Sequence, residues 1–72
     1  MKWNGEKLKQ LRLKNNMSIE DLAYEYRKYY DKVTRQTISN WENNVTIPNV
    51  LNAFILAQIF GVDVNYFMEE EK

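Results

Sequence analysis

The sequence predicts a small all-α domain built around one hydrophobic core. With 72 residues the chain is too short to bury two cores, so we expect a single domain over residues 1–72. Its core should span about residues 5–68, with an acidic tail at 69–72. Apolar residues recur at helical spacing, whereas strict alternation and hairpin turn dipeptides are missing. Caps and breaks divide the periodic segments into five expected helices joined by short links.

The first two helices are separated by a pair of asparagines. Residues 5–15 carry Leu8 and Leu11 on one face and lysines on the other, and Asn15 ends this pattern because asparagine favours turns. The second helix is expected to begin after Ser18, whose hydroxyl suits an N-cap. Asp21 stands where glutamate or glutamine would complete a capping box, so we expect an imperfect box.

The remaining helices follow from caps, a proline and a glycine. A third helix should start at Thr34 and stop at residues 43–44. Pro48 fits the first position of a fourth helix, which Gly61 would end. Because residues 50–60 are apolar on nearly every side, this helix should be buried all round, with Leu51, Leu56, Ala57 and Phe60 in the core. A short fifth helix is expected at residues 65–68.

The composition argues against catalysis. The chain has no cysteine and no histidine, which removes thiolate ligands, the commonest metal ligand and the usual general base. It also has no glycine-rich phosphate loop and no cluster of carboxylates at ligand spacing. We therefore expect neither an enzyme nor a metal or cofactor site. No apolar run approaches the roughly 20 residues of a membrane span, so a cytoplasmic protein without a membrane partner is expected.

The charges are balanced in number but unevenly distributed. The net charge is zero, which argues mildly against binding to nucleic acid. Lysine and arginine dominate the first half of the chain, while acidic residues gather at its end. The fold can therefore present a basic face with the acidic end elsewhere, or a mixed charged surface that only keeps the protein soluble.

The third expected helix has the polar face of a DNA reader. While Ile38 and Trp41 point inward, the outer side carries Arg35, Gln36 and Asn40. Arginine can bind guanine O6 and N7 together, and glutamine or asparagine can bind adenine N6 and N7. A capped helix, a connection and a second capped helix are the parts of a helix-turn-helix. A solvated polar face in an ordinary small bundle is the alternative.

The wider pattern resembles the lambda-repressor-like (Cro/C1, or XRE-type) helix-turn-helix family. The resemblance lies in Leu22 and Ala23 followed by "VTRQTISNWEN", with "LAQIFGV" at the right distance. "GEKLKQLRLKNNMSIEDLA" resembles the first two helices of the family and "IPNVLNAFILAQIFGVDVNYFM" the fourth and fifth, so the likeness covers about residues 5–68. It implies a five-helix domain that binds double-stranded DNA as a transcriptional regulator of the repressor kind. A protein-interaction module, such as an antitoxin or adaptor, is the competing hypothesis.

The resemblance also implies roles for individual residues. Base reading falls to Arg35, Gln36 and Asn40. Contacts with the DNA backbone or with thymine methyls fall to Thr37 and Asn43, and we add Ser18 and Lys32 to that group. A structural ion pair between the first and third helices is implied for Arg12 and Glu42.

The chain departs from the family pattern at several positions. Ile19 replaces a glutamine that often reads DNA, and Asn44 replaces the usual glycine after the third helix. The spacing from Ala23 to Val33 is roughly five residues longer than the common family spacing. We expect residues 26–32 to extend the second helix and its turn, with their tyrosines packed on the core. Contact of their basic and aromatic groups with phosphates is the alternative. The loop at 45–47 lacks basic residues, which predicts modest affinity and a shallow salt dependence.

The fourth helix raises the question of a partner. Phe54 and Ile55 lie on flanks that so small a core need not cover. We expect a two-fold homodimer formed by Phe54, Ile55, Val64 and Phe67, which would place two recognition helices about 34 Å apart on a palindrome. A thick monomeric core is the alternative. No small-molecule ligand is expected.

Overall fold

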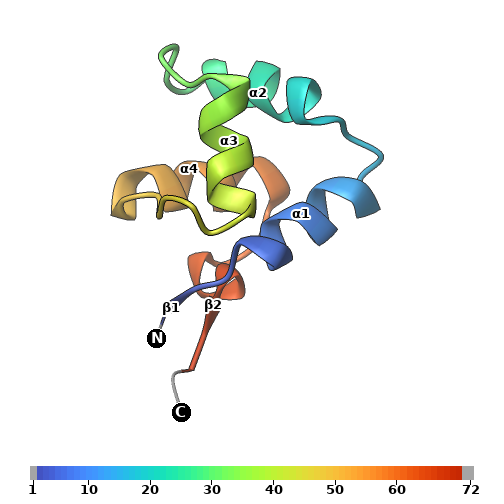
Figure 1. The fold of residues 1–72 in the computed structure, drawn as a ribbon. Helices are drawn as coiled ribbons and strands as arrows, with labels where there is room; N and C mark the ends of the chain where they lie inside the picture. Colours follow the sequence, from blue (N-terminus) through green and yellow to red (C-terminus); the bar gives the residue numbers. More distant parts are fainter. Residues whose placement is uncertain (1, 71–72) are drawn as a thin grey trace.

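The computed structural model describes residues 2–70 as four α-helices wrapped around one core (Figure 1). The helices are α1 (Gly5–Lys14), α2 (Ile19–Arg27), α3 (Arg35–Glu42) and α4 (Val50–Phe60). They are followed by a 3-10 helix, η1 (Val64–Phe67). Two short strands, β1 (Lys2–Trp3) and β2 (Met68–Glu69), pair antiparallel and bring the described ends of the chain together.

A side-chain cap precedes every α-helix. Asn4, Ser18, Thr34 and Asn49 each accept a hydrogen bond from a backbone N–H in the first turn. The capping box at Ser18 is complete, contrary to expectation: the Ser18 N–H donates to Asp21 Oδ2 at 2.9 Å, and the Asp21 N–H donates to Ser18 Oγ at 3.0 Å. Aspartate is therefore long enough to close the box here.

The start of α4 also differs from the prediction. Because Asn49 is the cap, α4 begins at Val50, and Pro48 lies before the helix rather than at its first position. The Pro48 side chain is buried. The end of α4 is as expected, since Gly61 adopts φ 68° and ψ 32°, the left-handed conformation that glycine takes without steric cost.

The prediction of a fifth α-helix at residues 65–68 is wrong. Residues 64–67 form only a 3-10 turn, because the chain must straighten at Met68 to pair with Trp3. Glu69, which we expected in a frayed acidic tail, is part of β2 and lies opposite Lys2, with the Lys2 Nζ 3.9 Å from its carboxylate. The core consequently begins earlier than residue 5, since the Trp3 side chain is buried and its ring lies 5.4 Å from that of Phe67.

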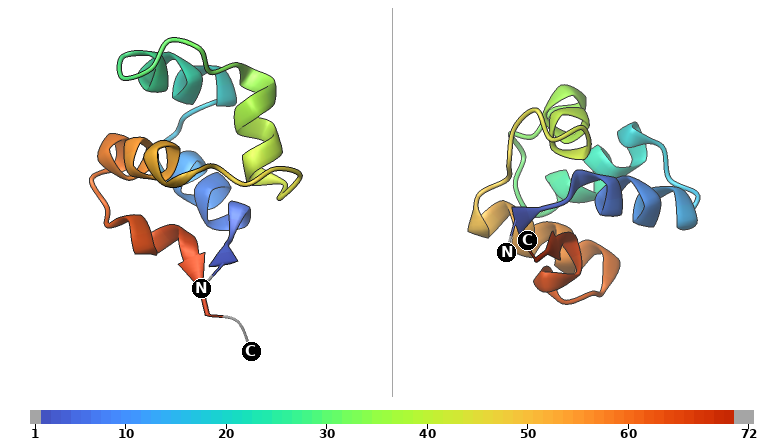
Figure 2. Two further views of the ribbon diagram at one scale, coloured as in Figure 1. Left: turned by 90° about the vertical axis from the view of Figure 1, so that its left-hand side faces the viewer. Right: turned by 60° about the horizontal axis from the view of Figure 1, so that its bottom comes forward.

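The core draws on every helix. Its fully buried side chains include Leu8, Leu22, Ile38 and Leu56, one from each α-helix, and Phe67 from η1. Figure 2 shows how this arrangement places the four helices around a shared centre. The core stabilises the fold chiefly by removing these apolar side chains from water.

Helix α4 is not buried all round. Ala53, Leu56 and Ala57 face the core, but Val50, Leu51 and Phe54 are exposed, with Leu51 63% accessible. The assignment of Leu51 to the core was therefore wrong. Phe60 is partly buried and packs against the core. A chain of this size has too few other elements to cover both sides of an apolar helix.

The longer α2–α3 connection forms turns rather than more helix. Helix α2 ends at Arg27, whose Nε donates to the Val33 carbonyl at 3.3 Å and closes the connection. Tyr26 before it and Val33 after it are buried. Tyr29 and Tyr30 between them are about half exposed, so they do not pack into the core as we expected. The buried anchors at the two ends leave the middle of the connection outside.

Candidate nucleic-acid interface

Helix α3 lies on the outside of the molecule. It is nearest the viewer in Figure 1 and at the edge of the left view in Figure 2, with α2 crossing behind its start. Thr34 caps it, its Oγ1 accepting from the Thr37 N–H at 3.1 Å. Ile38, Trp41 and Glu42 form its buried face. The opposite face is therefore free to meet a large ligand such as a DNA groove.

A buried ion pair fixes α3 against α1. The Arg12 Nε donates to Glu42 Oε2 at 2.7 Å, and Nη2 donates to Oε1 at 3.1 Å. Both side chains are at least nine-tenths buried, and Arg12 Nη1 also donates to the Met17 carbonyl at 2.8 Å. This two-pronged geometry offsets the desolvation of the two charges and joins α1 to α3. The pair is the one implied by the family resemblance.

The C-terminal end of α3 is held by the N-terminal segment. The indole Nε1 of Trp3 donates to the Trp41 carbonyl at 2.8 Å, and the Gly5 N–H donates to Asn44 Oδ1 at 2.9 Å. Asn44, which replaces the usual glycine of the family, has φ 59°, a left-handed conformation that asparagine tolerates. A carbonyl at the end of α3 and the first N–H of α1 thus find partners far away in sequence.

The predicted base-reading residues lie on one exposed face. Arg35 and Gln36 are exposed in the first turn of α3, and Asn40 follows one turn later, partly exposed. Gln36 Nε2 donates to Asn40 Oδ1 at 2.9 Å, so the two amides form one hydrogen-bonded unit. The structure therefore brings together an arginine and an amide pair, side chains that can bind base edges in the major groove.

The residues predicted to contact the DNA backbone or thymine methyls lie on several elements. Thr37 and Asn43 lie on α3, where Asn43 Nδ2 donates to the Ser39 carbonyl at 2.9 Å. Ser18 lies at the start of α2, with its hydroxyl already accepting the capping bond. Lys32 is exposed in the α2–α3 connection, which begins well away from α3 and returns to it in the left view of Figure 2.

A groove runs between the start of α2 and α3. Its volume is about 540 Å³, and it is lined by Arg12, Ser18, Ile19, Glu20, Arg35, Gln36 and Ser39. The sequence analysis did not identify Glu20 as a site residue. The carboxylate Oε2 of Glu20 lies 3.5 Å from Nε of Arg35. No periodic pattern links these two positions, because only the crossing of α2 and α3 brings them together.

The residues expected at a dimer interface differ in their exposure to solvent. Phe54 is exposed, while Ile55 and Val64 are partly buried against the core. Phe67 is fully buried and offers no surface to a second copy, so its inclusion in the interface is wrong. Exposed apolar side chains continue from α4 into the preceding loop. We call this set the apolar surface: Val45, Ile47, Val50, Leu51 and Phe54.

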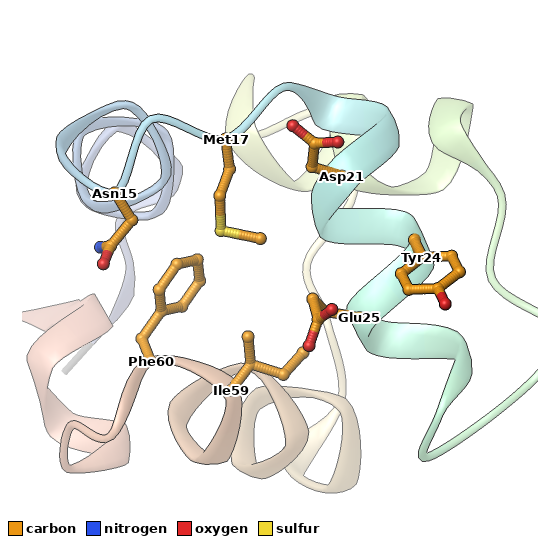
Figure 3. Close-up of a pocket in the computed structure, with 7 residues that line it drawn as sticks. All are labelled: Asn15, Met17, Asp21, Tyr24, Glu25, Ile59 and Phe60. Carbon is orange, nitrogen blue, oxygen red and sulfur yellow. The ribbon is translucent and has the colours of Figure 1, made fainter.

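A second groove, of about 370 Å³, lies on a different part of the surface. Figure 3 shows Met17, Ile59 and Phe60 pointing toward its centre, with Asp21 and Glu25 on the α2 side. It shares no lining residue with the groove beside α3. Asp21 is held by the capping box, and the hydrogen bonds from Ser18 lower its pKa.

The described part of the chain offers no metal site and no membrane span. Within residues 2–70, no three acidic, cysteine or histidine side chains come together as ligands. Within the same range, none of the helices has the length and apolar character needed to cross a bilayer.

Comparison with known proteins agrees with this geometry. A family model described as helix-turn-helix, of the Cro/C1 type and XRE-like, matches residues 8–67. The match spans most of the chain, and the chain belongs to this family of DNA-binding helix-turn-helix proteins. Neither the curated proteins nor the solved structures that were searched gave a match.

Proposed function

We propose that this protein is a sequence-specific transcriptional regulator, of the repressor kind, that inserts α3 into the major groove of operator DNA. The observation that carries the proposal is the row formed by Arg35, Gln36 and Asn40 on the outer face of a helix that is fixed from behind. Base reading needs side chains held within narrow geometric limits. The Arg12–Glu42 pair and the Trp3 indole supply that rigidity.

The proposed roles follow from the chemistry of each side chain. Arg35 binds guanine O6 and N7, and the Gln36–Asn40 unit binds adenine. Thr37, Asn43 and the Ser18 hydroxyl contact phosphates or thymine methyls and fix the register of the helix on the duplex. Lys32 adds an electrostatic contact from the α2–α3 connection. These are binding roles, so the proposed protein acts without catalysis.

We further propose that the protein acts as a two-fold dimer through the apolar surface. One recognition helix covers only a few base pairs, and a chain of net charge zero has little general attraction for DNA. A second copy adds a second recognition helix and a second set of contacts with the DNA backbone. Val50, Leu51 and Phe54 are 54–72% exposed on one helix, an arrangement that a self-complementary interface would bury.

Selection from a pool of random duplex DNA tests base reading. The wild type should enrich a palindromic motif, and Arg35→Ala should lose or relax one position in each half-site. Lys28→Ala is the matched control. It also removes one positive charge, but the Lys28 side chain pairs with Glu25 of α2 and is not part of the α3 row. Failure of the wild type to enrich any motif at low salt contradicts the proposal and favours a protein-interaction module.

Sedimentation velocity tests the dimer separately. The wild type should sediment as a dimer at micromolar concentration, and Phe54→Asp should sediment as a monomer with an unchanged circular-dichroism spectrum. A wild type that remains monomeric at high micromolar concentration, both free and with the selected duplex, contradicts the dimer while leaving base reading intact.

A further inference from the structure

We propose that Glu20 is a specificity-determining residue, which positions Arg35 for guanine and weakens binding to all other DNA. This inference rests on the proposed function. Its starting observation is the ion pair across the helix crossing, where Glu20 Oε2 lies 3.5 Å from Arg35 Nε. Both residues line the groove between α2 and α3, and both side chains are exposed, at 59% and 72% respectively.

The atoms that form the pair determine which N–H donors of Arg35 remain available to DNA. The ion pair engages the Nε side of the guanidinium, and the two terminal Nη groups keep their donors. Guanine O6 and N7 together accept two parallel N–H bonds, which the terminal groups can supply. An arginine held in advance also loses less rotamer freedom when it binds. Glu20 therefore acts as a positioning residue for the base-reading arginine.

The charge of Glu20 has a second effect. Its carboxylate belongs to a surface that must approach phosphates, and it repels any duplex regardless of sequence. On a matched site the pre-oriented Arg35 compensates for this repulsion by binding guanine, whereas on an unmatched site it does not. Glu20 thus lowers non-specific affinity more than specific affinity, which raises the ratio between them.

Surface pairs of this kind stabilise folds very little, so the effect should be visible in binding and not in unfolding. Glu20→Gln keeps the size and removes the charge. We expect Glu20→Gln to bind a scrambled duplex more tightly than the wild type, by about threefold. The preference for the selected duplex over the scrambled one should fall by a similar factor. The midpoint of urea unfolding should shift only slightly, because Glu20 contributes only a surface pair and a charge in the first turn of α2.

Two further variants separate positioning from a general charge effect. Glu25→Gln makes the same chemical change on α2 at a carboxylate paired with Lys28, and it should leave the selected-to-scrambled ratio unchanged. In an Arg35→Ala background, Glu20→Gln should still tighten non-specific binding but should no longer change the ratio. In nuclear magnetic resonance spectra of the free protein, the Arg35 Nε–H signal should exchange with water faster once Glu20 is replaced by glutamine.

The outcomes distinguish this inference from the proposed function. If Arg35→Ala relaxes the selected motif while Glu20→Gln shifts both duplexes by one common factor, Glu20 is only a surface charge and the inference is wrong. If the wild type does not discriminate between duplexes at all, the proposed function fails and the inference fails with it.

Discussion

Buried polar side chains set the arrangement of this small domain residue by residue. Arg12 and Glu42 satisfy each other and the Met17 carbonyl, and no buried side-chain nitrogen or oxygen of the described residues lacks a partner. An unpaired charge in this position would cost several kilocalories per mole, so alternative packings of α1 against α3 are strongly disfavoured. The polar core thereby determines where the exposed face of α3 points.

Tyr26 supplies a pH-dependent prediction at the same scale. Its hydroxyl donates to Asn52 Oδ1 at 2.6 Å, and burial, together with nearby Tyr30, raises its pKa to about 12. Tyr26→Phe should lower the free energy of unfolding by about 1 kcal/mol at neutral pH, because the hydrogen bond is lost. Urea unfolding followed by circular dichroism measures this difference.

The sign of the pH effect follows from the raised pKa. Below pH 10 the tyrosine is protonated in both the folded and the unfolded state, and its contribution is complete. As the pH rises from about 10 to about 12, the unfolded chain ionises first, so the stability difference between wild type and Tyr26→Phe should narrow. A difference that stays constant over this range would contradict the assignment of the high pKa to Tyr26.

At the scale of elements, the start of a helix depends on nearby residues, whereas the contact between two helices depends on residues far apart in the chain. Every α-helix starts after a side-chain cap, which is a local signal, and the sequence predicted two of these caps, Ser18 and Thr34. How closely two helices approach depends on residues far apart in the chain. Gly5 is an example, because the first turn of α1 packs directly on the last turn of α3.

Gly5→Ala should therefore destabilise the protein although alanine favours helices. An added Cβ would overlap the backbone carbonyl oxygens of Trp41 and Glu42, which cannot move without separating α1 from α3. We expect a loss of about 2 kcal/mol or more in the free energy of unfolding, measured by urea denaturation. A smaller loss than that of the control below would show that the helices can shift apart cheaply.

Gly61→Ala is the matched control for this prediction. An added Cβ at Gly61 meets open space, so the cost comes only from the left-handed backbone at φ 68°. That conformation should cost alanine about 1 kcal/mol. The two glycines thus separate steric overlap between helices from local backbone strain.

The pairing of the chain ends completes the molecule as a whole. Strands β1 and β2 join residues at opposite ends of the described chain, and Asn4 Nδ2 donates to Glu69 Oε2 at 2.9 Å beside them. This pairing positions Trp3, whose ring packs on Phe67 and whose indole N–H donates to the Trp41 carbonyl at the end of α3. The ends of the chain therefore support the face that we propose reads DNA.

Trp3→Ala should consequently affect both stability and α3. Removing this buried side chain should cost roughly 3 to 5 kcal/mol of unfolding free energy. Hydrogen exchange of backbone amides near the end of α3 should accelerate, because the Trp41 carbonyl loses its indole donor. Lys2→Ala, on the same strand but exposed, should change neither quantity. Unchanged exchange in α3 would show that the indole bond does not stabilise the helix end.

The sequence by itself determined the helical class, the starts of the first three α-helices and the family of this protein. Those features depend on neighbours within a few residues, on caps, periodicity and the "TISNWEN" pattern. It also located the exposed row on α3, since a residue one helical turn from a polar residue shares its face.

The tertiary structure alone decided the contacts between distant segments. The β1–β2 pair, the burial of Trp3 and Phe67, the exposure of Leu51 and the meeting of Glu20 with Arg35 depend on how helices cross. Apolar character shows that a side chain favours burial, but whether it is buried depends on which elements remain to cover it. For that reason the composition of α4 predicted a fully buried helix, and the fold left one side of it open.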